Sequence, residues 1–197
     1  MPDVIPNAST FLIAQISDLH LKAGGKPSYG VVDTLAALRR AVEHLNASQP
    51  RTDVVVISGD LVDFGQPEEY AVLRPELDRL HMPYYLVPGN HDDRGHLLAA
   101  FADHAYLPQL AEAPLDWVVD SHPLRLIGLD TTIPGSHGGQ LQDSQLRWLD
   151  AQLTQRPQVP TLLILHHPPF ISGIGHMDRE PFLNAVALHC LLYTSDA

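Results

Sequence analysis

Cysteine is nearly absent from this chain of 197 residues, because Cys190 is the only one. A single cysteine excludes a disulfide framework within the chain and a zinc site built on several thiolates. Positive charge is also scarce: 12 lysine and arginine residues stand against 23 acidic residues, which gives a formal net charge of −11. This balance disfavours a broad surface for nucleic acid or anionic membranes, so an anionic substrate needs a local source of positive charge.

Targeting signals and long apolar runs are missing as well. Residues 1–10 lack a cationic start followed by an apolar stretch, and Phe11–Ile16 is much too short to cross a bilayer. We therefore expect a soluble, cytoplasmic protein. The length and the 45% hydrophobic content fit one globular domain with a sizeable core, and no repeat or Gly-, Ser- or Pro-rich linker divides the chain.

Apolar periodicity predicts a mixed α/β fold. Residues 11–60 alternate strand, helix and strand, which predicts a parallel β-α-β unit, and Pro75 predicts a kink or break inside the second helix. Asp143 is the expected cap of the last predicted helix. The expected strands cover 11–16, 54–60, 83–87, 117–120, 124–130 and 161–165, with the fourth and fifth forming a hairpin. The expected helices cover 31–45, 67–80, 95–101 and 143–153.

The central strand is the unbroken apolar run that starts after Asp53 and ends at Ser58, Gly59 and Asp60. A carboxylate at the end of a buried strand is costly unless positive charge meets it there. Taken alone, Asp60 is more simply a helix cap or a solvent-facing acid. Three other strand ends, which also finish in potential ligands, make a metal ligand the better interpretation.

Those three strand ends share the same pattern. Asp18 and His20 follow the first strand two residues apart, so both side chains point to one side of an extended backbone. Asn90 and His91 follow the third predicted strand, and His166 follows the last one. Ligands of open α/β sheets bind at the carboxyl ends of the strands. Because adjacent residues on a strand point in opposite directions, we expect only one of His166 and His167 to reach the same site as Asp60.

The donor types indicate a transition-metal site. Carboxylate, imidazole and amide donors without sulfur favour Zn, Mn, Co or Fe over Mg or Ca, which prefer shells made only of oxygen. The donors outnumber those of a single tetrahedral zinc. Two ions about 3.5–4 Å apart and bridged by one carboxylate would use them all.

The order of the four motifs is specific where each one alone is not. The sequence has D-x-H at 18–20, G-D at 59–60, G-N-H-D at 89–92 and H-H-P-P at 166–169. Together they resemble the calcineurin-like metallophosphoesterase superfamily. Within it, residues 29–30, 67–70, 90–93 and 177–178 are most similar to glycerophosphodiesterases and class III 3′,5′-cyclic-nucleotide phosphodiesterases. The resemblance covers roughly residues 11–185 and implies an αββα sandwich of two mixed β-sheets flanked by helices.

The resemblance also implies roles for the matching residues. Asp18 and His20 look like ligands of the first metal, Asp60 like the bridging carboxylate, and Asn90 and His166 like ligands of the second metal. The implied cofactors are two divalent or trivalent transition-metal ions, namely Fe, Mn, Zn or Co.

Two further residues have implied catalytic roles. His91 is similar to the histidine that contacts the phosphate and assists the leaving group, and Asp92 to a carboxylate that orients a histidine. The implied reaction is in-line attack of a metal-bound hydroxide on a small phosphodiester, either a glycerophosphodiester or a 3′,5′-cyclic nucleotide. The expected partner is thus a small-molecule phosphodiester rather than nucleic acid or membrane. The sequence leaves open whether the full-length protein forms oligomers.

The chain departs from the family at its end. Family members continue to a strand ending in G-H-x-H, which this sequence lacks. We expect residues 11–188 to form an incomplete, C-terminally truncated catalytic domain and 189–197 to be an atypical tail of artefactual or truncated origin. The alternative is a non-catalytic remnant with weak or no metal binding. Tyr29, His137 and His176 are candidate pocket walls, although surface or packing roles are the simpler interpretation, and Asp63 is expected to be solvated.

Overall fold

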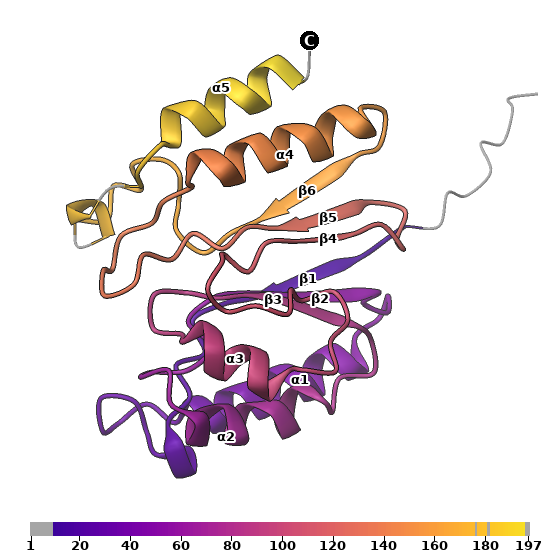
Figure 1. Ribbon diagram of the computed structural model, residues 1–197. Helices are drawn as coiled ribbons and strands as arrows, with labels where there is room; N and C mark the ends of the chain where they lie inside the picture. Colours follow the sequence, from indigo (N-terminus) through magenta and orange to yellow (C-terminus); the bar gives the residue numbers. More distant parts are fainter. Residues whose placement is uncertain (1–9, 176, 181, 196–197) are drawn as a thin grey trace, which may run out of the picture.

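The protein consists of two three-stranded sheets that face each other, with helices on both outer sides (Figure 1). The computed structural model describes residues 10–175, 177–180 and 182–195. His176, one of the candidate pocket walls, lies outside the described residues. The αββα arrangement expected from the sequence is confirmed.

The first half of the molecule is a wholly parallel sheet in the order β1-β2-β3. The central strand β2 is buried at every residue, as an all-apolar run in a covered parallel sheet should be. Its strands are β1 (Ile13–Ile16), β2 (Val54–Ser58) and β3 (Tyr84–Val87). Three helices cover its outer face in Figure 1, namely α1 (Thr34–Ala47), α2 (Pro67–Leu77) and α3 (Arg94–Ala100).

The second half contains the mixed sheet. Strands β4 (Trp117–Val119) and β5 (Arg125–Gly128) are antiparallel, which confirms the predicted hairpin, and β6 (Thr161–Ile164) runs parallel to β5. The outer face of this sheet is covered by α4 (Asp143–Gln155), on which α5 (Ala185–Ser195) lies (Figure 1). Two short 3₁₀ helices, η1 (Ala23–Gly25) and η2 (Met177–Arg179), lie in the connecting loops.

Helix starts differ from the predicted ones because of local capping. Asp33 accepts a hydrogen bond from the Ala36 backbone N–H at 2.9 Å, so α1 begins at Thr34. Val31, predicted as the first member of the buried stripe, therefore precedes the helix and is 83% exposed. In α4 the N-cap is Gln142, and the predicted cap Asp143 is the first helical residue.

Pro75 does not break α2. The helix continues through Pro75 and ends two residues later at Leu77. Because proline lacks a backbone donor, its place in the last turn leaves few helical hydrogen bonds to disturb.

The core is unequally divided between the halves. One large cluster of buried apolar side chains fills the space under α1–α3 and between the two sheets. A small separate cluster lies under α4 and α5 and consists of Ile127, Leu129, Leu141, Leu149 and Leu188. The expected domain end at residue 188 falls within α5, and this boundary stays a prediction. Among the described residues, no helix combines the length and apolar character needed to span a bilayer.

Candidate metal centre

The loops that follow β1 and β2 run side by side and bring the first two motifs together. The backbone N–H of Asp18 donates to Gly59 at 3.1 Å, and that of His20 donates to Asp60 at 3.0 Å. Asp18, His20 and Asp60 all have positive φ angles, of 55°, 43° and 50°. Left-handed backbone is unfavourable for side chains other than glycine and gathers at functional sites. The strain thus falls on the residues predicted as metal ligands.

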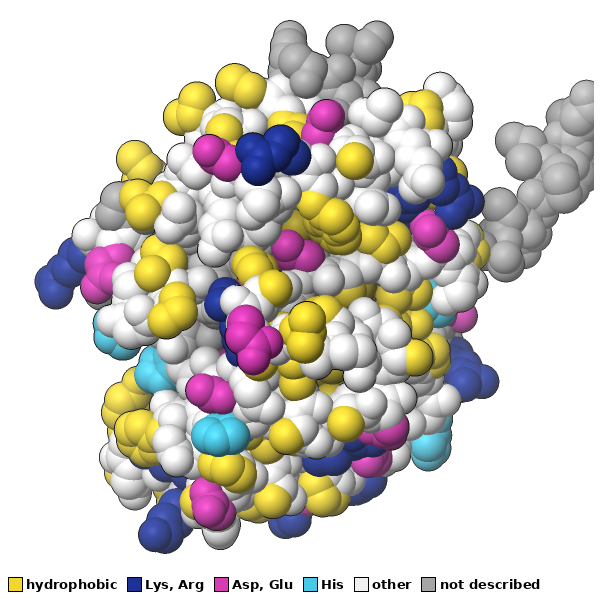
Figure 2. All heavy atoms as spheres, in the orientation of Figure 1, with side chains coloured by type: hydrophobic (Ala, Val, Ile, Leu, Met, Phe, Trp, Pro, Cys, Tyr) yellow, Lys and Arg dark blue, Asp and Glu magenta, His cyan; other side chains and the backbone are white. Residues whose placement is uncertain are grey.

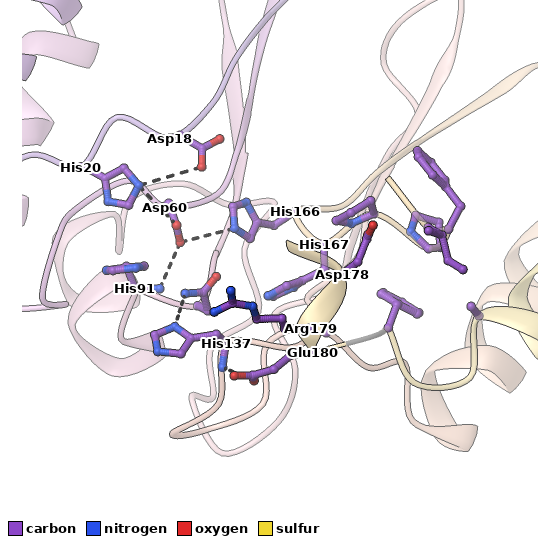
Figure 3. A pocket seen from close by; sticks show the side chains of 18 of the residues that line it. Asp18, His20, Asp60, His91, His137, His166, His167, Asp178, Arg179 and Glu180 are labelled. Atoms are coloured by element: carbon purple, nitrogen blue, oxygen red, sulfur yellow. Dashed lines mark hydrogen bonds and ion pairs between the residues drawn. The ribbon is translucent and has the colours of Figure 1, made fainter. Parts of the chain in front are cut away.

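The Asp60 carboxylate lies at the centre of the site (Figure 3). Its Oδ2 is 3.5 Å from His20 Nε2 and its Oδ1 is 3.5 Å from His166 Nε2, while the residue is only 4% exposed. Asp18 Oδ1 lies 3.9 Å from His20 Nε2. A buried carboxylate that turns each oxygen to a different histidine has the arrangement of a bridging ligand.

Two groups of donor atoms share Asp60. His20, Asp60 and His91 form one group and Asp18, Asp60 and His166 the other, with the donor atoms of each group within 4.8 Å of one another. The structure therefore brings together the carboxylate and imidazole residues predicted as ligands, and it adds His91. The grouping differs from the one implied by the resemblance, which pairs Asp18 with His20.

Backbone carbonyl groups fix the orientation of two of the histidines. His166 Nδ1 lies 2.7 Å from the Ser58 carbonyl oxygen, and His91 Nδ1 lies 2.7 Å from that of Asp63. Because a carbonyl only accepts, Nδ1 carries the proton in both rings and Nε2 offers a lone pair. This is the usual outer support of a metal-binding imidazole, so both rings fit the role of a ligand.

Asp63 supports His20 and was missed by sequence reasoning. Its Oδ1 is 3.3 Å from His20 Nδ1, an atom that is buried and lacks a hydrogen bond among the described residues, and its Oδ2 is 3.0 Å from Lys22 Nζ. The side chain is only 13% exposed, so the expectation of a solvated acid was wrong. The pairing of the 18–21 and 60–63 loops buries it, and no local sequence signal indicates that pairing.

Asp92 holds a turn rather than a histidine. Its carboxylate accepts hydrogen bonds from the backbone N–H groups of Leu61 at 3.1 Å and Gly89 at 2.8 Å, and from the Tyr70 hydroxyl at 2.9 Å. The expectation that it orients a histidine is thus corrected, since Asp63 is the carboxylate next to His20. Withdrawal from water raises the pKa of Asp92 to about 6 and also raises the pKa of Tyr70.

The glycines of the G-D and G-N motifs allow backbone and candidate ligand side chains to approach closely. A Cβ on Gly89 would lie 2.2 Å from Asp60 Oδ1, and one on Gly59 would lie 2.5 Å from the His166 ring. Gly59 also has a φ of +91°. These two positions need glycine because the backbone touches ligand side chains directly.

Asn90 and His137 lie on another wall of the same cleft. Asn90 Nδ2 is 3.1 Å from His137 Nδ1, which leaves the Asn90 amide oxygen without a partner among the described residues. His137 is exposed yet lines the cleft, as does Tyr29, so two of the three candidate wall residues are found there.

His167 lines the same cleft as His166 but belongs to neither donor group. Its Nδ1 lies 2.7 Å from the Thr131 hydroxyl, and the residue is 7% exposed. Burial, reinforced by the neighbouring His166, lowers the pKa of His167 to about 4. The ring is therefore neutral near pH 7 and is a packing residue beside the ligands.

The donors open into a cleft of about 620 Å³ at one edge of the two sheets. Figure 2 shows histidine side chains along the left edge of the molecule, where the loops after the strands meet in Figure 1. Acidic and basic side chains are mixed over the face in view. A cleft of this size admits a small ligand, and its donor set of oxygen and nitrogen atoms fits borderline transition metals.

Comparison with protein families decides the assignment. Residues 11–190 match the family model described as calcineurin-like phosphoesterase. The chain belongs to this family. Members of the calcineurin-like phosphoesterases use divalent metals, which agrees with the donor groups around Asp60.

Several relatives are similar in sequence. The chain is 38% identical over 169 residues to a probable glycerophosphodiester phosphodiesterase, GpdQ, of Arcobacter nitrofigilis, covering 86% of this chain and 61% of the relative. It is 42% identical over 190 residues to a cAMP/cGMP dual specificity phosphodiesterase of Mycobacterium tuberculosis, covering 94% of this chain and 58% of the relative. The chain thus spans about three fifths of the length of these relatives.

A solved structure supports the fold. A purple acid phosphatase from yellow lupin seeds superposes with a TM-score of 0.58 at 15% identity, covering 83% of this chain and 31% of the phosphatase. At this identity the likeness concerns the fold alone.

Proposed function

We propose that this calcineurin-like phosphoesterase hydrolyses small phosphodiesters, either glycerophosphodiesters or 3′,5′-cyclic nucleotides, at a centre of two transition-metal ions. The observation that carries the proposal is the position of Asp60, whose two carboxylate oxygens face His20 and His166 at 3.5 Å each. The phosphodiesterase relatives on both the glycerophosphodiester and the cyclic-nucleotide side support the substrate class.

The proposed ligands are those at the strand ends. Asp18, His20, Asp60, Asn90 and His166 would hold two ions, with Asp60 shared between them. When bound, such ions neutralise phosphate charge and make water a nucleophile at neutral pH. The chain has a net charge of −11, which repels an anionic substrate. The ions would supply positive charge at the place where the substrate binds.

His91 is the proposed proton donor. Its Nδ1–H is held by the Asp63 carbonyl oxygen at 2.7 Å, so the ring cannot turn away and Nε2 stays directed at the cleft. When the ring is an imidazolium and also carries a proton on Nε2, that proton can pass to the departing alkoxide oxygen of the diester, which would otherwise be a poor leaving group. His91 also belongs to one donor group with His20 and Asp60, which supports a role beside a phosphate that such ions would bind.

Asp92 is proposed as a positioning residue. By accepting hydrogen bonds from Gly89 and Leu61 it fixes the turn that carries Asn90 and His91 against the loop after β2. The Tyr70 hydroxyl locks the carboxylate from the side of α2. Its contribution is therefore the geometry of its neighbours.

Metal-dependent hydrolysis of bis(p-nitrophenyl) phosphate tests the proposal. The chain is stripped with chelator, titrated with Mn²⁺ and compared with Asp60→Asn and with Asp150→Asn, an exposed acid of α4 that changes the net charge equally. We expect the wild-type rate to appear only with metal and to be unchanged in Asp150→Asn. In Asp60→Asn the rate should fall by more than the roughly 10–100-fold that is lost when an outer-shell partner of a metal ligand is removed.

A folded chain with no metal-dependent rate would support the alternative of a non-catalytic remnant. If hydrolysis is found, the kcat/KM values for glycerophosphocholine and for cAMP under the same conditions decide between the two substrate classes.

A further inference from the structure

The segment that follows the H-H-P-P motif places one basic side chain in the cleft. Arg179, at the end of η2, lines the cleft together with Asp60 and His91, and no other lysine or arginine is among the residues that line it in the described structure. Figure 3 shows the Arg179 side chain pointing into the cleft, toward the part that holds the histidines. The family motifs do not include this residue.

The carboxylate that precedes Arg179 is already fully engaged. Asp178 accepts hydrogen bonds from the backbone N–H of Ser172 at 2.8 Å, the Ser172 hydroxyl at 2.9 Å and the backbone N–H of Gly173 at 2.9 Å. These bonds to Ser172 and Gly173 lower the pKa of Asp178. The carboxylate therefore serves to close the loop that leads into η2.

The carboxylate that follows Arg179 is engaged on the opposite side. Glu180 accepts hydrogen bonds from the Ser136 hydroxyl at 3.0 Å and from the backbone N–H of His137 at 3.1 Å (Figure 3). Close by, the backbone N–H of Leu183 donates to Gly139 at 2.7 Å. These contacts fasten the η2 segment to the loop that carries His137.

The residues on both sides of Arg179 are thus held in place, while Arg179 itself is exposed and has no hydrogen bond or ion pair with the described residues. A guanidinium group at the rim of a cleft, beside two carboxylates that bind other groups, is free to bind an anion. A chain with 23 acidic and 12 basic residues needs such a local positive charge to bind an anionic substrate. A planar guanidinium can donate two parallel hydrogen bonds to one phosphate, which an ammonium group cannot do.

We infer that Arg179 is a substrate-binding residue that donates hydrogen bonds to the non-bridging phosphate oxygens of the diester. The inference rests on the proposed function, since it uses the same cleft and the same class of substrate. Because these oxygens are charged before and during the reaction, the contact acts on binding of the ground state as well as the transition state. The loss of Arg179 should therefore appear mainly in KM rather than in kcat.

The experiment compares wild type, Arg179→Gln, Arg179→Lys and Arg147→Gln, an exposed arginine of α4 outside the cleft lining. Hydrolysis of bis(p-nitrophenyl) phosphate gives kcat and KM, and calorimetric titration of the Mn²⁺-loaded chain with inorganic phosphate gives a readout that does not depend on turnover. For Arg179→Gln we expect KM and the phosphate Kd to rise about tenfold with kcat within about threefold. Arg179→Lys should lie between Arg179→Gln and wild type, and Arg147→Gln should match wild type.

The outcomes separate the inference from the proposed function. If wild type hydrolyses the diester but Arg179→Gln behaves like Arg147→Gln, the inference is overturned and the proposed function stands. If Arg179→Gln weakens phosphate binding while no variant hydrolyses the diester, Arg179 is a phosphate-binding residue and the proposed function fails. A wild-type chain that neither binds phosphate nor hydrolyses the diester contradicts both.

Discussion

The two halves of the sandwich differ in how firmly they are built and in what they contribute to the site. Each sheet has a fully buried central strand, β2 or β5, and a partly exposed edge strand, β1 or β6. The halves differ in their cores, since α1–α3 pack on the large apolar cluster and α4 and α5 on the small one. Five of the six candidate site residues, counting His91 with the predicted ligands, follow strands of the first half, and only His166 follows the second. The half with the larger core thus carries most of the candidate ligands, and the other half adds one candidate ligand and the proposed phosphate-binding arginine.

This difference predicts that the same leucine-to-alanine change lowers the free energy of unfolding by different amounts in the two halves. Leu73 of α2 and Leu149 of α4 are both fully buried leucines on helices, but Leu73 belongs to the large cluster and Leu149 to the small one. We expect Leu73→Ala to lower the free energy of unfolding by about 3–5 kcal/mol and Leu149→Ala by about 2 kcal/mol, since a thin layer relaxes more easily around a cavity. Urea unfolding of the metal-free chain measures both, and equal losses would refute the comparison.

A methyl group where the loops after β2 and β3 meet tests how tightly the first half packs around Asp60. Gly89→Ala places a Cβ against Asp60, whereas Gly175→Ala adds one where nothing lies within 4 Å. We expect Gly89→Ala to lower the free energy of unfolding by about 1–3 kcal/mol and to weaken metal binding, because the displaced atom is an oxygen of a proposed ligand. Gly175→Ala is the matched control and should change neither quantity. If both variants bind Mn²⁺ with the wild-type affinity, the close packing around Asp60 is not needed for metal binding.

The support of His20 can be removed without touching a ligand. Asp63→Asn keeps the size of the side chain but removes the charge next to His20 Nδ1 and Lys22 Nζ. Loss of such a partner lowers metal affinity by about 10–100-fold in known sites, and we expect about tenfold here. The control is Asp103→Asn, which breaks an exposed ion pair with Arg74. A metal Kd that is equal in both variants would show that Asp63 serves only the loop.

The second half contains a titratable group whose effect on stability depends on pH. Asp116 accepts hydrogen bonds from the Asp130 backbone N–H and the Gln145 side chain, and burial raises its pKa to about 6, with Asp130 adding to the rise and Arg94 opposing it. The folded chain then keeps this proton to a higher pH than the unfolded chain, so stability falls as pH rises from about 4 to about 6.

Asp116→Asn should remove that fall. Relative to wild type, the variant should gain about 1 kcal/mol between pH 4 and pH 7, a value reduced from the full shift because the residue is partly exposed. Urea unfolding of both chains at the two pH values measures the difference. A constant difference would mean that the pKa of Asp116 is the same in the folded and the unfolded chain.

The fold and most candidate ligands could be predicted because their signals are local. Apolar runs locate the strands, and each ligand directly follows a run, so Asp60 and His166 could be placed at one edge of a sandwich from the motifs alone. That only one of His166 and His167 joins a donor group agrees with the alternation of neighbours along a strand, which does not by itself say which one.

The supporting residues could not be predicted in this way because they depend on which loops pair. Asp63 is buried only because the chain beyond β2 continues to bond with the chain beyond β1, and Asp92 meets Tyr70 and Leu61 across two elements. Glu69 is a partial exception. It is only 2% exposed, and its spacing from Gln66 is that of a capping box, which can be read from the sequence.

The most direct test of the central claim is a titration of the metal-free chain with Co²⁺, followed by visible absorption, for wild type, Asp60→Asn and His166→Gln. Because Asp60 belongs to both donor groups and His166 to only one, the account predicts two bound ions in wild type, loss of affinity for both in Asp60→Asn and loss of one in His166→Gln. An Asp60→Asn chain that binds two Co²⁺ ions as tightly as wild type would contradict it.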